Sequence, residues 1–201
     1  MRISGILLAA GQGRRFGSNK LLHPLGDGTP LVLHSVRTLQ AVLPDTLVVV
    51  NAQDNGTIVL LESEDVNMVL NHSADAGMGT SVATGVRARP SAEGWVITLA
   101  DMPYLRKKTI RSVAAALKDR SSICAPCYQG QRGHPVGFGS DYADALMKLS
   151  SDEGARHIIS ANRERLELFE TSDPGVIIDI DHRKDLERSA VVEKAGFTSF
   201  S

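Results

Sequence analysis

The sequence has few aromatic residues, almost no net charge and no long apolar run. Phe, Trp and Tyr make up 4 % of the 201 residues, so Val, Leu, Ile and Ala must form the core. A net charge of -1 predicts none of the basic faces that nucleic-acid-binding proteins carry. No apolar run approaches the roughly 18 residues of a membrane-spanning helix. We therefore expect a cytoplasmic protein that binds neither nucleic acid nor membrane.

The sequence is also poor in cysteine. Cys124 and Cys127 stand in "SSICAPCY", where a strand is expected rather than the helix N-terminus of a redox pair. Side chains three positions apart on a strand point to opposite faces, so we expect two unpaired thiols. The length suits one core, and we assign residues 1–190 to a single domain and 191–201 to a loosely held tail.

Apolar runs rich in β-branched residues alternate with helical patterns along the chain. This alternation predicts an α/β fold, a three-layer sandwich around a mostly parallel, Rossmann-like sheet. The segment 129–139 breaks the alternation and predicts an antiparallel edge pair or a flap. The expected strands cover 3–9, 45–51, 66–71, 94–100, 122–128, 133–139, 165–170 and 175–181, and the expected helices cover 29–43, 53–64, 79–89, 106–119, 140–149 and 153–164, with a last helix beginning at 183.

The first strand runs into a glycine-rich turn, "LLAAGQGRRFGSNK" (7–20). Its glycines lack the G-x-G-x-x-G spacing of a Rossmann dinucleotide site, and no Ser or Thr follows Lys20 as in a P-loop. A third design fits better: Gly11 and Gly13 let backbone N–H groups approach anionic oxygens, while Arg15 and Lys20 add two full charges. Because ligands bind beyond the carboxyl ends of parallel strands, we expect a triphosphate here.

A second glycine-containing stretch, "NHSADAGMGTSVATG" (71–85), follows the third strand. Gly77 and Gly79 would allow close approach of a flat base, and the helix that begins at Thr80 and Ser81 offers free N–H donors. Helix capping by either hydroxyl is the structural alternative.

Carboxylates follow two later strands. Asp101 ends the strand of "VITLADMPYL", where a carboxylate is costly without a cation or donor, and Mg²⁺ takes one or two carboxylates plus substrate phosphates. Helix capping by Asp101 is the alternative. "GVIIDIDHRKDL" (175–186) predicts a strand in which Asp179 and Asp181 face the same side, with one of them reaching the metal.

"GQRGHPVGFG" (130–139) predicts a tight, locally rigid segment. A lone histidine such as His134 is commonly a structural hydrogen-bonding group, and no second histidine is spaced to join it in a metal site.

These motifs together resemble the nucleotidyltransferases that make cofactor and sugar dinucleotides, with the fold of nucleotide-diphospho-sugar transferases. Within them the sequence is similar to the molybdenum cofactor cytidylyltransferase and molybdopterin-guanine dinucleotide synthase family. The "D-M-P" and "R-G-H-P-V" motifs occur in order, and "SSDEGARHII" (150–159) matches G-D-x-G-A-R except at Ser151. The opening signature L-A-[AG]-G-x-x-x-R-[MF]-G-x-x-K is matched by Leu8, Ala9, Ala10, Gly11, Arg15, Phe16, Gly17 and Lys20.

The resemblance implies roles for individual residues. Asp101 and Asp181 would hold Mg²⁺ or Mn²⁺, Asp181 being selected by position although His182 and Arg183 replace the family's Thr-Pro. His134 and Pro135 would face the acceptor, and the catalytic set would be Arg15, Lys20 and Asp101. The nucleotide would be bound by Leu8, Ala9, Ala10, Gly11, Gly13, Arg15, Lys20, Asn71, Gly77, Gly79, Thr80 and Ser81.

The implied reaction is attack of an acceptor phosphate on the α-phosphorus of a nucleoside triphosphate, with release of pyrophosphate. Ala10, together with the R-G-H-P-V motif, resembles the branch that transfers CMP from CTP to the phosphate of molybdopterin, a phosphorylated pterin. Transient contact with a molybdoenzyme or its chaperone is then expected. The alternatives are use of GTP or of another phosphorylated metabolite, a nucleotide-sensing accessory protein, and a Rossmann dehydrogenase.

Overall fold

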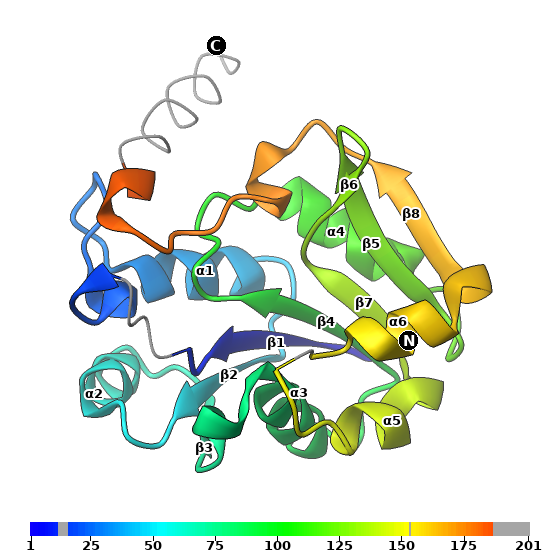
Figure 1. Ribbon diagram of the computed structural model, residues 1–201, viewed down its shortest axis with the longest axis horizontal. Coiled ribbons are helices and arrows are strands. Elements are labelled where there is room, and N and C mark those ends of the chain that lie inside the picture. The colour runs from blue at the N-terminus through cyan, green and yellow to red at the C-terminus, as the bar shows by residue number, and fades with distance from the viewer. Residues whose placement is uncertain (12–15, 153, 187–201) are drawn as a thin grey trace.

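The computed structural model describes residues 1–11, 16–152 and 154–186. They form an eight-stranded, mostly parallel sheet flanked by helices (Figure 1). The strands are β1 (Ile3–Ala9), β2 (Thr46–Asn51), β3 (Met68–Asn71), β4 (Gly94–Leu99), β5 (Ile123–Tyr128), β6 (Gln131–Arg132), β7 (Val136–Gly139) and β8 (Leu166–Glu170). The α-helices are α1 (Leu31–Gln40), α2 (Asn55–Ser63), α3 (Met78–Arg87), α4 (Lys107–Ala116), α5 (Ala143–Met147) and α6 (Arg156–Ala161).

The sheet is buried on both faces, as its continuous apolar runs predict. Along β1, Leu7 and Ala9 belong to a core cluster that includes residues of α1, α2 and α4, whereas Ile6 and Leu8 belong to a second cluster that includes residues of α3, α5 and α6. In Figure 1, α1 and α4 lie on one side of the sheet, and α3 and α5 lie on the other. The predicted three-layer α/β fold is therefore confirmed.

The strand order β3-β2-β1-β4 creates a crevice at the carboxyl ends of β1 and β4. The chain moves outward from β1 through β2 to β3 and then returns across β1 to form β4. Leu8 of β1 pairs in register with Val49 on one side and Leu99 on the other, and both pairings are parallel. Such a reversal of strand order is where ligands bind in α/β sheets.

The segment 129–139 forms two strands, of which β6 pairs antiparallel with β5 at the end of the strand order and β7 lies inside the sheet. The β5–β6 pair agrees with the expected antiparallel edge pair, whereas β7 is inserted antiparallel between β4 and β5. A Cβ on Gly137 would come within 2.6 Å of the Cys124 Sγ atom, so this central position needs a glycine. Both cysteines are buried and unpaired, which confirms the expectation for the two thiols.

The expected strand at 175–181 is wrong. This segment begins with a 3₁₀ helix, Pro174–Val176, and continues as irregular backbone. Its backbone bonds go to the ends of other elements: the Val176 carbonyl accepts from the His134 N–H at 2.8 Å, and the Ile180 N–H donates to the Asp101 carbonyl at 2.9 Å. The segment therefore lies across the loops that follow the strands.

Residues 183–186 are helical, in agreement with a last helix beginning at 183, and the tail 191–201 lies outside the described residues. None of the described helices combines the length and the apolar character that crossing a membrane would require.

Candidate active site

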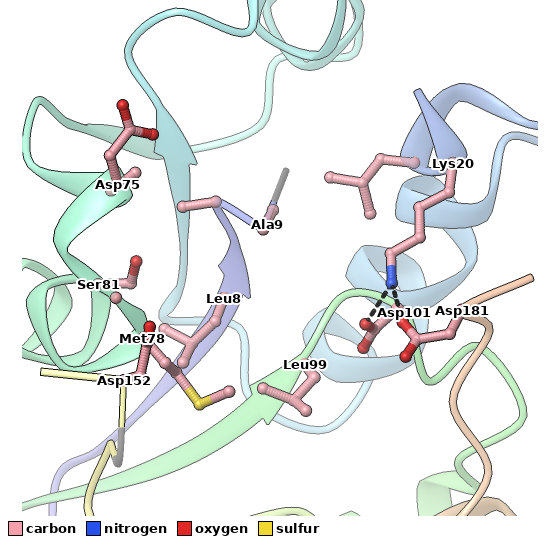
Figure 2. Close-up of a pocket in the computed structure, with 15 residues that line it drawn as sticks. Leu8, Ala9, Lys20, Asp75, Met78, Ser81, Leu99, Asp101, Asp152 and Asp181 are labelled. Atoms are coloured by element: carbon pink, nitrogen blue, oxygen red, sulfur yellow. Dashed lines mark hydrogen bonds and ion pairs between the residues drawn. The ribbon is translucent and has the colours of Figure 1, made fainter. Parts of the chain in front are cut away.

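A cavity of about 530 Å³ opens at the crevice between β1 and β4. Figure 2 shows Lys20, Asp101 and Asp181 on one side of the opening, with Asp75 and Ser81 on the other. We call this space the first cavity. It is lined by Leu8, Ala9, Ala10, Gly11, Lys20, Leu21, Ala74, Asp75, Gly77, Met78, Ser81, Leu99, Asp101, Asp152 and Asp181.

The Lys20 ammonium joins the two carboxylates that the resemblance selects. Its Nζ donates to Asp101 Oδ2 at 2.7 Å and to Asp181 Oδ1 at 2.9 Å (Figure 2). Lys20 is 6 % exposed. Burial lowers the pKa of the ammonium, but the charges and hydrogen bonds of both carboxylates outweigh burial and raise the pKa above its ordinary value. The amine is therefore charged at neutral pH.

Local structure fixes Lys20 at this point. The 3₁₀ helix Lys20–Leu22 is capped by Asn19, whose Oδ1 accepts from the Leu21 N–H at 3.1 Å. The Asn19 amide donates in turn to Asp54 at 2.8 Å, and Asp54 caps α2. No sequence expectation named Asn19 or Asp54, although an Asn before a turn and an Asp before a helix are both recognisable capping signals.

Asp181 is brought close to Asp101 by the segment that follows residue 172, which is irregular backbone rather than a strand. The buried Asp173 carboxylate accepts from the backbone N–H groups of Arg106 and Gly175, which anchors the segment against the β4–α4 connection. A Cβ on Gly175 would lie 2.3 Å from the Tyr104 carbonyl oxygen, so the close approach requires glycine.

The two carboxylates fit a divalent cation only in company with further ligands. Asp101 Oδ1 is buried and has no hydrogen-bond partner among the described residues, which leaves a strong acceptor available. In residues 1–11, 16–152 and 154–186, no group of three or more His, Cys, Asp or Glu side chains could hold a metal ion by itself. This donor set suits Mg²⁺, which commonly binds through one or two carboxylates plus substrate phosphates.

The described lining of the first cavity is acidic. Asp75, Asp101, Asp152 and Asp181 stand against one cation, Lys20. A triphosphate could enter such a cavity only with additional positive charge. The expected contributions of Gly13 and Arg15 lie outside the described residues, whereas Leu8, Ala9, Ala10 and Gly11 line the cavity as expected.

The stretch expected to bind the base is only partly exposed to the cavity. Gly77 and Ser81 line it, but Asn71, Gly79 and Thr80 do not belong to the described lining. The Asn71 amide is buried and donates to the Thr80 and Ser81 hydroxyls at 2.9 Å and 3.0 Å. Asn71 therefore holds the start of α3 in place.

The two glycines of this stretch make room for another part of the chain. A Cβ on Gly77, whose φ is +119°, would lie 2.3 Å from Asp152 Oδ1. A Cβ on Gly79 would lie 2.6 Å from the Ser151 carbonyl oxygen, which accepts the Gly79 N–H at 2.8 Å. Asp152 thus forms part of the cavity wall and Ser151 packs against Gly79, contacts that a reading of 71–85 alone could not reveal.

A second cavity of about 500 Å³ adjoins the first. The two share Leu8, Met78, Leu99 and Asp152, which we call the shared wall. His134 lines the second cavity, whereas Pro135 does not belong to its described lining, and that the two residues face an acceptor stays a prediction. Burial, and then the charge of Arg132, lower the pKa of His134 to about 4, so the imidazole is neutral at neutral pH.

Asp179 also lines the second cavity rather than the first. Burial, and then the charges of Asp101 and Asp181, raise the pKa of Asp179 above its ordinary value. Three carboxylates therefore interact where the two cavities meet, one more than the pair expected to hold a metal.

Comparison with known proteins matches residues 5–166 to the model of a family described as the MobA-like NTP transferase domain. Among curated proteins, the purine catabolism protein PucB of Bacillus subtilis is 29 % identical, and the match covers 88 % of this chain and 90 % of that protein. The nicotine blue oxidoreductase of Paenarthrobacter nicotinovorans is 26 % identical, with 92 % and 95 % covered.

Solved structures show the same fold. A nucleotidyl transferase from Methanothermobacter thermautotroptrophicus superposes with a TM-score of 0.81 at 22 % identity, covering 96 % of this chain and 99 % of that one. Rv0371c from Mycobacterium tuberculosis, in a complex with manganese, superposes with a TM-score of 0.77 at 22 % identity, covering 94 % and 97 %.

Proposed function

We propose, from the premise that the chain belongs to the MobA-like NTP transferase domain family, that it transfers CMP from CTP to the phosphate of molybdopterin and releases pyrophosphate. The observation that carries this proposal is the Lys20 ammonium between Asp101 and Asp181, at the switch point of the sheet and beside a second cavity. Nucleotide and acceptor would occupy the first and second cavities, respectively.

In this proposal the carboxylates and the ammonium separate when the nucleotide binds. Asp101 and Asp181 would hold Mg²⁺ or Mn²⁺, which would supply positive charge to the triphosphate, and Asp101 Oδ1, which has no hydrogen-bond partner among the described residues, offers an oxygen for it. Lys20, freed from the carboxylates, donates to phosphate oxygens. The manganese in the similar mycobacterial structure supports the use of a divalent cation.

The transfer needs little covalent chemistry from the protein. An oxygen of the acceptor phosphate attacks the α-phosphorus, the bond from that phosphorus to the bridging oxygen breaks, and the pair of electrons leaves with pyrophosphate. Positioning of the two substrates and compensation of charge then account for the rate. Both cavities are lined by Leu8, Met78, Leu99 and Asp152, so the two substrates would lie next to each other where the cavities adjoin.

The choice of CTP rests on Ala10 and the R-G-H-P-V motif, which resemble the cytidylyl branch. GTP or another phosphorylated acceptor is the alternative within the same reaction class. A nucleotide-binding accessory protein is disfavoured because such a protein has no need of two carboxylates at the triphosphate. The relative named nicotine blue oxidoreductase suggests a dehydrogenase as a further alternative. The glycines of the turn after β1 do not have the spacing of a Rossmann dinucleotide site, which disfavours it.

Pyrophosphate release tests the proposal. The protein is incubated with molybdopterin, Mg²⁺ or Mn²⁺, and CTP, GTP, ATP or UTP in turn, and we expect turnover with CTP and formation of a cytidylylated pterin. Turnover with GTP and with no other nucleotide would mean that the protein transfers GMP rather than CMP. No turnover with any combination, although nucleotides raise the melting temperature, would favour the accessory protein, since a ligand stabilises the folded form that it binds.

A further inference from the structure

The second cavity contains two arginines that form no ion pair with another described residue. Arg132 ends β6, and Arg156 is the first residue of α6. Neither guanidinium forms a hydrogen bond or ion pair with any residue among 1–11, 16–152 and 154–186. Arginines on a protein surface are commonly free, but two that line one cavity form a preorganised positive corner.

The two charges act on the same part of the cavity. Burial, and then the charge of Arg156, lower the pKa of Arg132. Both arginines also lower the pKa of His134, after the larger effect of burial. The imidazole is thereby kept neutral, and the positive charge of this corner belongs to the arginine pair alone.

The backbone holds the like charges near each other. Arg132 pairs in register with Cys127 of β5, and the next residue, Gly133, passes so close to Val176 that a Cβ would lie 2.3 Å from its carbonyl oxygen. Arg156 is placed by α6, whose Ile158 and Ile159 are buried in the core. The fold therefore keeps two guanidinium groups close together although they repel each other, and a bound anion would relieve this repulsion.

The surroundings indicate what kind of anion would fit. The sheet side of the cavity is apolar, formed by Ile97, Val136 and Phe138. Asp152 and Asp179 also line the cavity, and Asp179 interacts with Asp101 and Asp181 of the first cavity. His134 is affected both by Asp101 and by Arg132, so the arginine pair and the carboxylates act on one common region.

We propose that Arg132 and Arg156 bind the phosphate monoester of an acceptor whose flat, apolar body lies against the sheet. This inference rests on the proposed function and deepens it, because it assigns the residues that hold the attacking phosphate. A phosphate monoester carries about -1.5 to -2 charges at neutral pH, which two guanidinium groups match, and each can donate two parallel hydrogen bonds. The pair would select an anionic acceptor and leave its oxygen at the junction of the two cavities.

The test compares two fluorescent probes that differ by one phosphate. Flavin mononucleotide carries a planar ring and a phosphate monoester, and riboflavin carries the same ring without the phosphate. Both are titrated, by fluorescence, into the wild type, Arg132→Gln, Arg156→Gln and the control Arg111→Gln, whose arginine lies exposed on α4 outside both cavities. A non-hydrolysable α,β-methylene analogue of CTP with Mg²⁺ fills the first cavity in a parallel series.

We expect the wild type to bind the phosphorylated flavin at least about tenfold more tightly than riboflavin, as charge-assisted hydrogen bonds allow. Each cavity variant should lose most of this difference without a change in riboflavin affinity, and Arg111→Gln should keep it. Equal affinity of the wild type for both probes, or variants that bind like the wild type, would overturn the inference.

The series with the nucleotide analogue distinguishes failure of the arginine inference from failure of the proposed function. The analogue should raise the melting temperature of the wild type and of both arginine variants equally, because neither arginine lines the first cavity. A wild type that does not respond to the analogue contradicts the proposed nucleotide site, whereas the flavin titrations still decide whether the arginine pair recognises phosphate.

Discussion

The first and second cavities share a wall but present opposite chemistry. The described lining of the first holds four carboxylates and one ammonium, whereas the second places two arginines beside an apolar floor and keeps two carboxylates near the junction. In the first cavity, the cation is already paired with two acids at 2.7 Å and 2.9 Å. In the second, the cations have no partner among the described residues.

This difference indicates how each cavity meets an anion. Under the proposed function, an anionic ligand that reaches Lys20 in the first cavity must displace an existing ion pair, and a divalent metal held by the two carboxylates would add positive charge there. An anion in the second meets guanidinium groups directly. Two negatively charged substrates can thereby approach each other, because each has a separate source of positive charge.

Asp101→Asn should have the largest effect, because Asp101 follows β4 in the lining of the first cavity and its Oδ1 has no hydrogen-bond partner among the described residues. We expect turnover, measured as pyrophosphate release, to fall by about 100-fold or more, a loss typical of an electrostatic group in an active site. Asp144→Asn, at an exposed position of α5, is the matched control and should retain wild-type turnover and melting temperature. A near-normal rate for Asp101→Asn would remove Asp101 from the metal.

Lys20→Ala should lower turnover by a comparable ~100-fold through the loss of charge at the phosphates. The variant also leaves Asp101 and Asp181 facing each other without their ammonium, so its melting temperature without metal should fall. Mg²⁺ should restore more stability to this variant than it adds to the wild type. If both CTP affinity and rate survive the change, the triphosphate does not lie at the opening turn.

The sequence predicted the strands well where burial on both faces decides the structure. β1 occupies Ile3–Ala9, as its uninterrupted apolar run indicates. The similar run at 175–181 does not form a strand, because strand formation depends on a neighbouring strand and the partners here are loop ends at Asp101 and His134. Local hydrophobicity does not contain that information.

For the site, the sequence predicted which residues take part but not which residues they contact. The resemblance selected Lys20, Asp101 and Asp181, which the structure brings together, but nothing near any of them in sequence indicates that the ammonium lies between the carboxylates. The glycines at 77 and 79 looked suited to a ligand, and their neighbours are residues 151 and 152, more than seventy positions away. Contacts of that range follow from the packing of α3 against α5 and the loop beyond it.

The smallest effect we predict tests whether the wall between the cavities is shared. Met78 lines both cavities, and its side chain lies near Leu99 in Figure 2, with 43 % of the residue exposed. Each bound substrate that covers part of this exposed side chain gains about 1 kcal/mol, so Met78→Ala should raise the KM for nucleotide and for acceptor by about fivefold each. Val59→Ala, at a 63 % exposed position of α2 outside both cavities, should change neither value. A change confined to one KM would mean that Met78 contacts one substrate, and that the two cavities bind their ligands independently.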